Sequence, residues 1–125
     1  MDVFTPGTHG STFGGNPLAC AIAREVIAYI KEERPEQRAR EIGGYFMERL
    51  RGLSSERIAA VRGRGLMVGV DIAARFGKAS DICHALKDQG LLCKDTREQT
   101  VRFAPPLVIE QADIDWSMKR IARVV

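Results

Sequence analysis

Residues 58–72 read IAAVRGRGLMVGVDI, and the hydrophobic pattern changes in this stretch from a helical period to a strand period. Ile58 to Arg62 and Leu66 to Ile72 are rich in β-branched and apolar residues, and Gly63-Arg64-Gly65 separates the two runs. Short apolar runs bounded by glycines are typical of β-strands. We therefore predict two strands here, and the elements on either side determine what covers them.

Two helices are predicted before these strands. Asn16-Pro17 supplies an N-cap residue followed by proline at the first helical position, and apolar residues then recur at helical spacing to about Lys31. Helical spacing returns from Pro35 to Arg51, with apolar side chains on one side and charges on the other. The first helix is more apolar than one small sheet requires, so we expect it to need a second covering surface.

The segments after residue 72 predict a helix, two short strands and a last helix. They are Gly77–Gln89, closed by Gly90 as a left-handed residue; Leu91–Cys93; Thr100–Phe103, after a polar turn at Lys94–Gln99; and Glu110–Val124. This order of elements predicts an α/β (α+β) fold, with helices laid over a small mixed or antiparallel sheet.

The composition predicts a folded protein with one main core. The chain has 125 residues, of which 45% are hydrophobic and 28% charged, values that argue against disorder and coiled coil. No apolar stretch is long enough to cross a membrane, and Met1 to Gly10 do not resemble a secretory signal. We therefore expect no membrane partner and a cytoplasmic location.

The charge pattern does not favour nucleic acid as a partner. The net charge is +3, but acidic and basic residues alternate along the chain, so no single face need become a phosphate-binding stripe. Cys20, Cys83 and Cys93 lack metal-ligand spacing, and His9 and His84 do not complete a set. We expect reduced thiols and no metal site.

The segment with the clearest chemical potential is GSTFGGNP at residues 10–17. Glycines let backbone N–H groups approach an anion, hydroxyl groups donate to phosphate oxygens, and a helix N-terminus adds partial positive charge. A glycine-rich loop before a helix is more often a simple connection, and this one matches neither the P-loop nor the dinucleotide fingerprint. From composition alone, both interpretations stay open.

The chain resembles the class III pyridoxal-phosphate aminotransferases. The resemblance rests on GTHGSTFGGNPLAC at residues 7–20, VRGRGLM at 61–67, GLLCKDT at 90–96 and VRFAPPLVI at 101–109. The last two stretches look like the ornithine aminotransferase branch, and Ala104 differs from the residue usual in the acetylornithine branch. The resemblance covers essentially the whole chain but only the C-terminal part of the family. It implies the small C-terminal domain of a fold-type I enzyme.

The resemblance also implies site residues. In the family, the Ser-Thr pair of the glycine-rich loop reaches across a dimer interface to the phosphate of pyridoxal 5'-phosphate in the neighbouring subunit, so Thr12 first and Ser11 second are cofactor-binding candidates. Arg102 corresponds to an arginine at the substrate site, paired with a glutamate of the large domain or with a substrate carboxylate. A planar guanidinium suits that bidentate task. Without the resemblance, Arg102 would be an ordinary exposed strand arginine.

The resemblance does not extend to a catalytic residue. Transamination requires a lysine that binds the coenzyme covalently and a carboxylate at its ring nitrogen, and in the family both precede this loop. The lysines that are present, Lys31, Lys78, Lys87, Lys94 and Lys119, fall in polar segments. The resemblance implies a C-terminal fragment of an ornithine aminotransferase, which we expect to be inactive alone and to need a large-domain polypeptide.

The expected organisation has two parts. Residues 1–33 would form the phosphate loop and a linking helix at the edge of the large domain, and residues 34–125 the small domain. Residues 1–15 are expected to be mobile without their ligand. The partners implied are an N-terminal polypeptide, further subunits in a homo-oligomer or heteromer, and a small-molecule substrate.

Three alternatives stay open at this point. The chain could be a non-catalytic interaction module that associates through the apolar face of its first helix. It could be the corresponding fragment of an acetylornithine aminotransferase. A nucleic-acid binder ranks last, because the charge pattern does not favour it.

Overall fold

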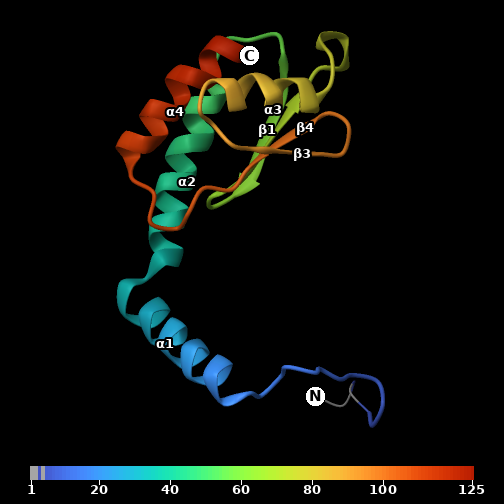
Figure 1. The fold of residues 1–125 in the computed structure, drawn as a ribbon. Coiled ribbons are helices and arrows are strands. Elements are labelled where there is room, and N and C mark those ends of the chain that lie inside the picture. Colours follow the sequence, from blue (N-terminus) through green and yellow to red (C-terminus); the bar gives the residue numbers. More distant parts are fainter. Residues whose placement is uncertain (1–2, 4) are drawn as a thin grey trace. The chain divides into compact units, whose positions relative to one another are not determined.

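The computed structural model describes Val3 and residues 5–125, and the chain divides into two compact units, Met1–Arg34 and Pro35–Val125. The first unit contains the glycine-rich loop and helix α1 (Pro17–Glu33) (Figure 1). The Asn16 side chain accepts a hydrogen bond from the Ala19 N–H at 2.9 Å, and Pro17 takes the first helical position. The predicted helix start is confirmed.

The second unit is a layer of helices on a four-stranded antiparallel sheet, which confirms the predicted fold class (Figure 1). The strand order is β1-β2-β4-β3. The elements of this unit are α2 (Pro35–Arg51), β1 (Ile58–Arg64), β2 (Met67–Ile72), a 3-10 turn (Ala74–Phe76), α3 (Ala79–Asp88), β3 (Lys94–Thr96), β4 (Thr100–Phe103) and α4 (Gln111–Val124).

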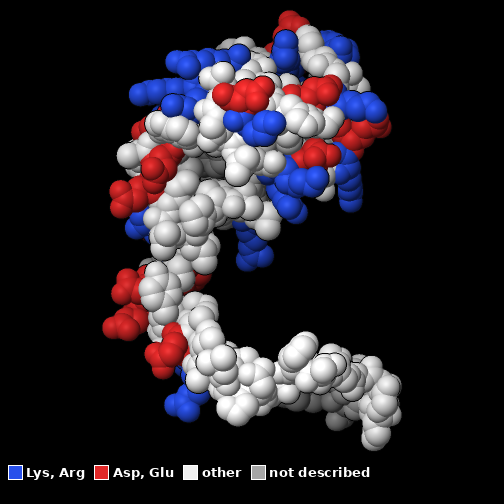
Figure 2. All heavy atoms as spheres, in the orientation of Figure 1, with Lys and Arg blue, Asp and Glu red and all other residues white. Residues whose placement is uncertain are grey.

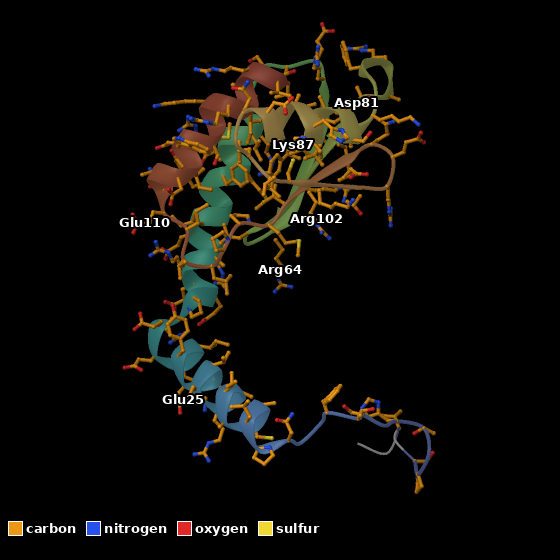
Figure 3. The ribbon with its side chains drawn as sticks, in the orientation of Figure 1. Glu25, Arg64, Asp81, Lys87, Arg102 and Glu110 are labelled. Atoms are coloured by element: carbon orange, nitrogen blue, oxygen red, sulfur yellow. The ribbon has the colours of Figure 1, made fainter. Side chains whose placement is uncertain are left out.

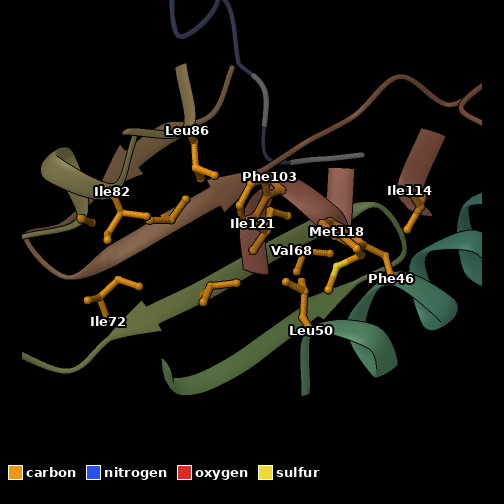
Figure 4. Close-up of a cluster of buried hydrophobic side chains, with 13 residues drawn as sticks. Phe46, Leu50, Val68, Ile72, Ile82, Leu86, Phe103, Ile114, Met118 and Ile121 are labelled. Carbon is orange, nitrogen blue, oxygen red and sulfur yellow. The ribbon is translucent and has the colours of Figure 1, made fainter. Parts of the chain in front are cut away.

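The core of the second unit lies between the helices and one face of the sheet (Figure 4). Successive strand residues point to opposite faces, so Val68, Val70 and Ile72 of β2 are buried while Met67 is exposed. The buried residues from the other elements include Phe46, Leu50, Ile82, Leu86, Val101, Phe103, Ile114, Met118 and Ile121. The opposite face of the sheet, which no helix of this unit covers, therefore carries most of the polar residues of the strands, including Arg62, Asp71 and Arg102.

The backbone of α2 packs closely against the loop between β1 and β2. Arg64 pairs with Met67, so the loop has two residues, and its first, Gly65, has a φ of +56°. Glycine is the default residue for that backbone conformation in a tight hairpin loop. A Cβ at Gly43 of α2 would lie 2.1 Å from the Gly65 carbonyl oxygen, so no side chain fits there. Gly65 of the first-quoted stretch thus forms the turn, and Gly43 of α2 allows the helix to pack on it.

The prediction of a strand at Leu91–Cys93 is wrong. The third strand is β3, Lys94–Thr96, within the segment expected to be a polar turn. The Leu91 N–H donates to the Leu86 carbonyl at 2.9 Å, which closes the end of α3, and the following Leu92 is 86% exposed. Thr96 pairs with Thr100, so the hairpin, with Arg97 at a φ of +52°, decides which residues form the strand. An edge strand can be polar because only part of its surface meets the core.

The end of α3 follows the expected chemistry. Gly90 adopts a φ of +82° after α3, as predicted for a left-handed residue at a helix end.

Within the described part of the chain, no helix combines the length and apolar character that crossing a bilayer requires.

Candidate functional site

The glycine-rich loop is held by its own side chains. The Ser11 hydroxyl accepts a hydrogen bond from the Gly14 N–H at 2.8 Å, and the Asn16 amide donates to the Phe13 carbonyl at 2.7 Å. A Cβ at Gly14 would lie 2.9 Å from Ser11 Oγ, so the turn needs glycine at that position. The loop is therefore a hydrogen-bonded turn that leads into the N-cap residue of α1.

Ser11 and Thr12 differ in their availability to a ligand. Ser11 Oγ is an acceptor within the turn, whereas the Thr12 hydroxyl has no hydrogen bond among residues 3 and 5–125, and both side chains are exposed. The donors that a phosphate needs are hydroxyl and backbone N–H groups near a helix N-terminus, and this loop provides them. The residues fit a phosphate group, with Thr12 as the freer donor.

Arg102 lies on β4, on the helix-free face of the sheet (Figure 3). Its neighbours Val101 and Phe103 are buried in the core, so alternation along the strand directs Arg102 to the opposite face, where it is exposed. The side chain lines a shallow hollow of about 300 Å³ together with Arg62, Gly63, Arg64, Met67, Val68, Gly69, Thr96 and Thr100. The lining contains three arginines and no carboxylate.

Only one of these arginines has an acidic partner in the described residues. Arg62 donates from Nη2 to Asp71 Oδ1 at 2.8 Å and from Nε to Asp71 Oδ2 at 3.0 Å, which is the bidentate geometry of a strong ion pair. Thr100 Oγ1 donates to the same carboxylate at 2.5 Å. The hydrogen bonds from Arg62, together with the one from Thr100, hold the pKa of Asp71 below its usual value despite partial burial. Asp71 is therefore an anion that binds Arg62 and leaves Arg64 and Arg102 unpaired.

Figure 3 labels Arg64, at the end of β1, and Arg102, on the interior strand β4, and both side chains line the hollow. Figure 2 shows basic and acidic atoms interspersed over the second unit. The sequence singled out Arg102 alone. Side chains alternate between the two faces of a strand, so the sequence of β1 alone predicts that Arg62 and Arg64 share a face. The sequence does not predict the strand register, in which Gly69 lies opposite both Arg62 and Arg102.

The other chemically capable side chains do not form a second site. Burial raises the pKa of Cys93 to about 12 and also raises that of Cys83, so neither thiol is a thiolate nucleophile near neutral pH. The five lysines are exposed, as expected from their polar segments. Another hollow of about 280 Å³, lined by residues such as Phe103, Pro105 and Ile109, has no ionisable side chain in its lining. Among the described residues, no cluster of His, Cys, Asp and Glu could hold a metal ion.

Comparison with known proteins identifies the family. The family model described as aminotransferase class-III matches residues 1–125. This chain belongs to the class-III aminotransferases. Among curated members, the ornithine aminotransferase of Oceanobacillus iheyensis is 50% identical over 125 residues, which is 100% of this chain and 31% of that protein.

Solved class-III aminotransferases have the same fold over this length. The crystal structure of ornithine aminotransferase from Toxoplasma gondii matches 98% of this chain and 30% of its own, with a TM-score of 0.86 and 41% identity. Acetylornithine aminotransferase from Elizabethkingia anophelis matches 98% of this chain and 32% of its own, with a TM-score of 0.84 and 38% identity. The chain thus spans about a third of the length of the class-III aminotransferases that it matches.

Proposed function

We propose that this chain forms part of an ornithine aminotransferase, which transfers the δ-amino group of ornithine to 2-oxoglutarate and produces glutamate semialdehyde and glutamate. The observation that supports this most strongly is the 50% identity with a curated ornithine aminotransferase over all 125 residues. Residues 1–33 would belong to the edge of the large domain and residues 34–125 would form the small domain. The remaining two-thirds of such a protein would supply the catalytic lysine.

The proposed cofactor is pyridoxal 5'-phosphate, which supplies an electron sink for amino-group transfer when it is bound. Thr12 would donate its free hydroxyl to the cofactor phosphate. Ser11 would act second, because its oxygen already accepts the Gly14 N–H. Its hydroxyl hydrogen stays available for a phosphate oxygen, so the turn and the ligand can be bound together.

Arg102 would bind a carboxylate, either of the substrate or of a glutamate in the large domain. Its exposure, its lack of an acidic partner among residues 3 and 5–125, and its place in a hollow lined by two further arginines support this role. A guanidinium group can donate two parallel hydrogen bonds to a carboxylate, which fixes orientation as well as charge.

A chimera tests the proposal. In the Oceanobacillus iheyensis enzyme, the matched 125 residues would be replaced by this chain, and the product assayed with ornithine or N-acetylornithine as amino donor. We expect ornithine to be preferred. Thr12→Val should weaken cofactor retention in dialysis by about tenfold, as loss of a hydrogen bond to a charged group predicts, and Ser11→Ala should weaken it less. A preference for N-acetylornithine would instead support the acetylornithine alternative, which the Elizabethkingia similarity also fits.

The exposed apolar face of α1 favours a second candidate, a non-catalytic interaction module. Leu18, Ile22, Val26 and Ile30 are each at least 44% exposed. A contiguous apolar surface of this kind is typical of an interface. Light scattering distinguishes the two: a chimera that is folded but inactive, together with self-association of the isolated chain, would favour the interaction module over the aminotransferase.

A further inference from the structure

The chain that follows α3 folds back along this helix. In the last turn of α3, the Leu86 carbonyl oxygen accepts a hydrogen bond from the Leu91 N–H at 2.9 Å. In the first turn, the Ala79 N–H donates to the Glu98 carbonyl oxygen at 3.1 Å. Residues 91–98 therefore run antiparallel to α3 and pass successively earlier parts of the helix.

This reversal brings the side chains of Cys83 and Cys93 together. Cys83 precedes Leu86 by three helical residues, a distance of about 4.5 Å along the helix axis. Cys93 follows Leu91 by two extended residues, about 6.6 Å, and so returns to a similar level. Both cysteines are half-buried against the hydrophobic core, whereas Leu92 is 86% exposed. A hydrogen bond joins the two thiol groups, which are therefore direct neighbours.

The environment of the pair decides which thiol reacts first. Burial raises the pKa of Cys83 and raises that of Cys93 to about 12, so both stay protonated and react slowly at neutral pH. The hydrogen bond between them acts on the pKa of Cys83 in the opposite direction, because the Cys93 S–H donates to Cys83 Sγ and stabilises a thiolate there. Cys83 is therefore the better nucleophile of the two.

We infer that Cys83 and Cys93 are an oxidation-sensitive dithiol pair, which a small-molecule disulfide converts to an intramolecular disulfide bond. Cys83 Sγ attacks one sulfur atom of the oxidant as a thiolate. The S–S bond of the oxidant breaks, and its other half leaves as a thiol with the proton that Cys83 released. Cys93 Sγ then loses its proton, attacks Cys83 Sγ and releases the second half of the oxidant as a thiol. Two electrons thus pass from the cysteines to the oxidant.

The new bond would join α3 to the residue that precedes β3 and would close the reversal between them covalently. This inference goes beyond the proposed function and does not depend on it, because neither cysteine belongs to the candidate cofactor or substrate residues.

The test compares the folded chain with the same chain unfolded in urea, both equilibrated with 2-mercaptoethanol and its disulfide at mildly alkaline pH. Cys20→Ser removes the exposed cysteine of α1 and leaves only the pair. Trypsin cuts after each lysine, so the disulfide joins peptides 79–87 and 88–94, which mass spectrometry detects after alkylation of the free thiols. The ratio of disulfide to dithiol should be at least about tenfold higher in the folded chain, because the fold raises the effective concentration of one thiol at the other.

A matched control moves one thiol to the next position of the helix. Cys83→Ser combined with His84→Cys hardly changes the separation in sequence, but His84 is exposed and does not pack against the core. In urea this control pair should behave like the original pair, and folding should not raise its ratio. If the folded chain forms the original disulfide no more readily than the unfolded chain does, the inference is overturned. That comparison needs no substitution at residues 83 or 84, so it decides the question even where the control does not fold.

Discussion

The two units of this chain have opposite relations between sequence and burial. Helix α1 has apolar residues at helical spacing, yet none of its residues is buried. Helix α2 has the same length of 17 residues and is more polar, yet it buries Phe46 and Leu50. An apolar stripe stabilises a fold only when something covers it. The comparison teaches that apolar spacing alone does not bury a helix: α2 packs against the sheet of its own unit, whereas no described residue of the first unit covers the apolar side of α1.

The largest expected effect tests this contrast directly. Leu50→Ala should lower the free energy of unfolding by about 2–5 kcal/mol, since Leu50 is fully buried and its removal leaves a cavity. Ile22→Ala, on the exposed face of α1, should change it by less than about 0.5 kcal/mol. Urea denaturation followed by fluorescence of Trp116 measures both. Equal destabilisation by the two changes would show that α1 is covered in solution.

A smaller expected effect is a loss of stability in α1 alone, without a change in the second unit. Asn16→Ala removes the N-cap acceptor for the Ala19 N–H and should destabilise α1 by about 1 kcal/mol. Amide hydrogen exchange should become faster within residues 17–33, while the amides of β2 and β4 keep their protection. Faster exchange throughout the sheet would contradict the separate behaviour of the two units. Ser54→Ala, a loop residue outside both helices, is a suitable control.

The smallest expected effect is a pH dependence confined to the second unit. The folded-state pKa of Asp71 is held below its unfolded value of about 3.9, mainly by hydrogen bonds from Arg62. The stabilisation is therefore complete above that unfolded pKa and is lost as the pH falls through the lower folded pKa. The difference in unfolding free energy between the original chain and Asp71→Asn should be constant from about pH 5 to pH 8 and shrink below about pH 4. A difference that grows on acidification would refute this assignment.

Much of the fold was readable from local chemistry. Asn16-Pro17 predicted the start of α1 and Gly90 the end of α3, because each satisfies a specific backbone requirement. Gly63-Arg64-Gly65 predicted the break between two strands, but Gly63 and Arg64 belong to β1 and the loop is Gly65-Leu66. The position of the third strand could not be predicted from the sequence. Leu91 to Cys93 are the more apolar residues, but the register of the hairpin at Arg97 selects Lys94–Thr96 instead.

The candidate site was readable only in part. The resemblance pointed to Ser11, Thr12 and Arg102, whose roles stay predictions. It did not show that Ser11 Oγ is held by the Gly14 N–H, nor that Asp71 binds Arg62. Both follow from hydrogen bonds whose partners the sequence does not name.

The sequence by itself predicted the helices and the first two strands, because these depend on spacing and backbone conformation along a short stretch of chain, and its resemblance to a family supplied the candidate residues. Only the tertiary structure decided that Arg102 shares a face with Arg62 and Arg64, that Arg62 is the one paired with Asp71, and that Gly69 lies opposite Arg102. The reason is physical: cross-strand pairing joins residues far apart in sequence, and a shift of one residue would send every side chain of a strand to the other face.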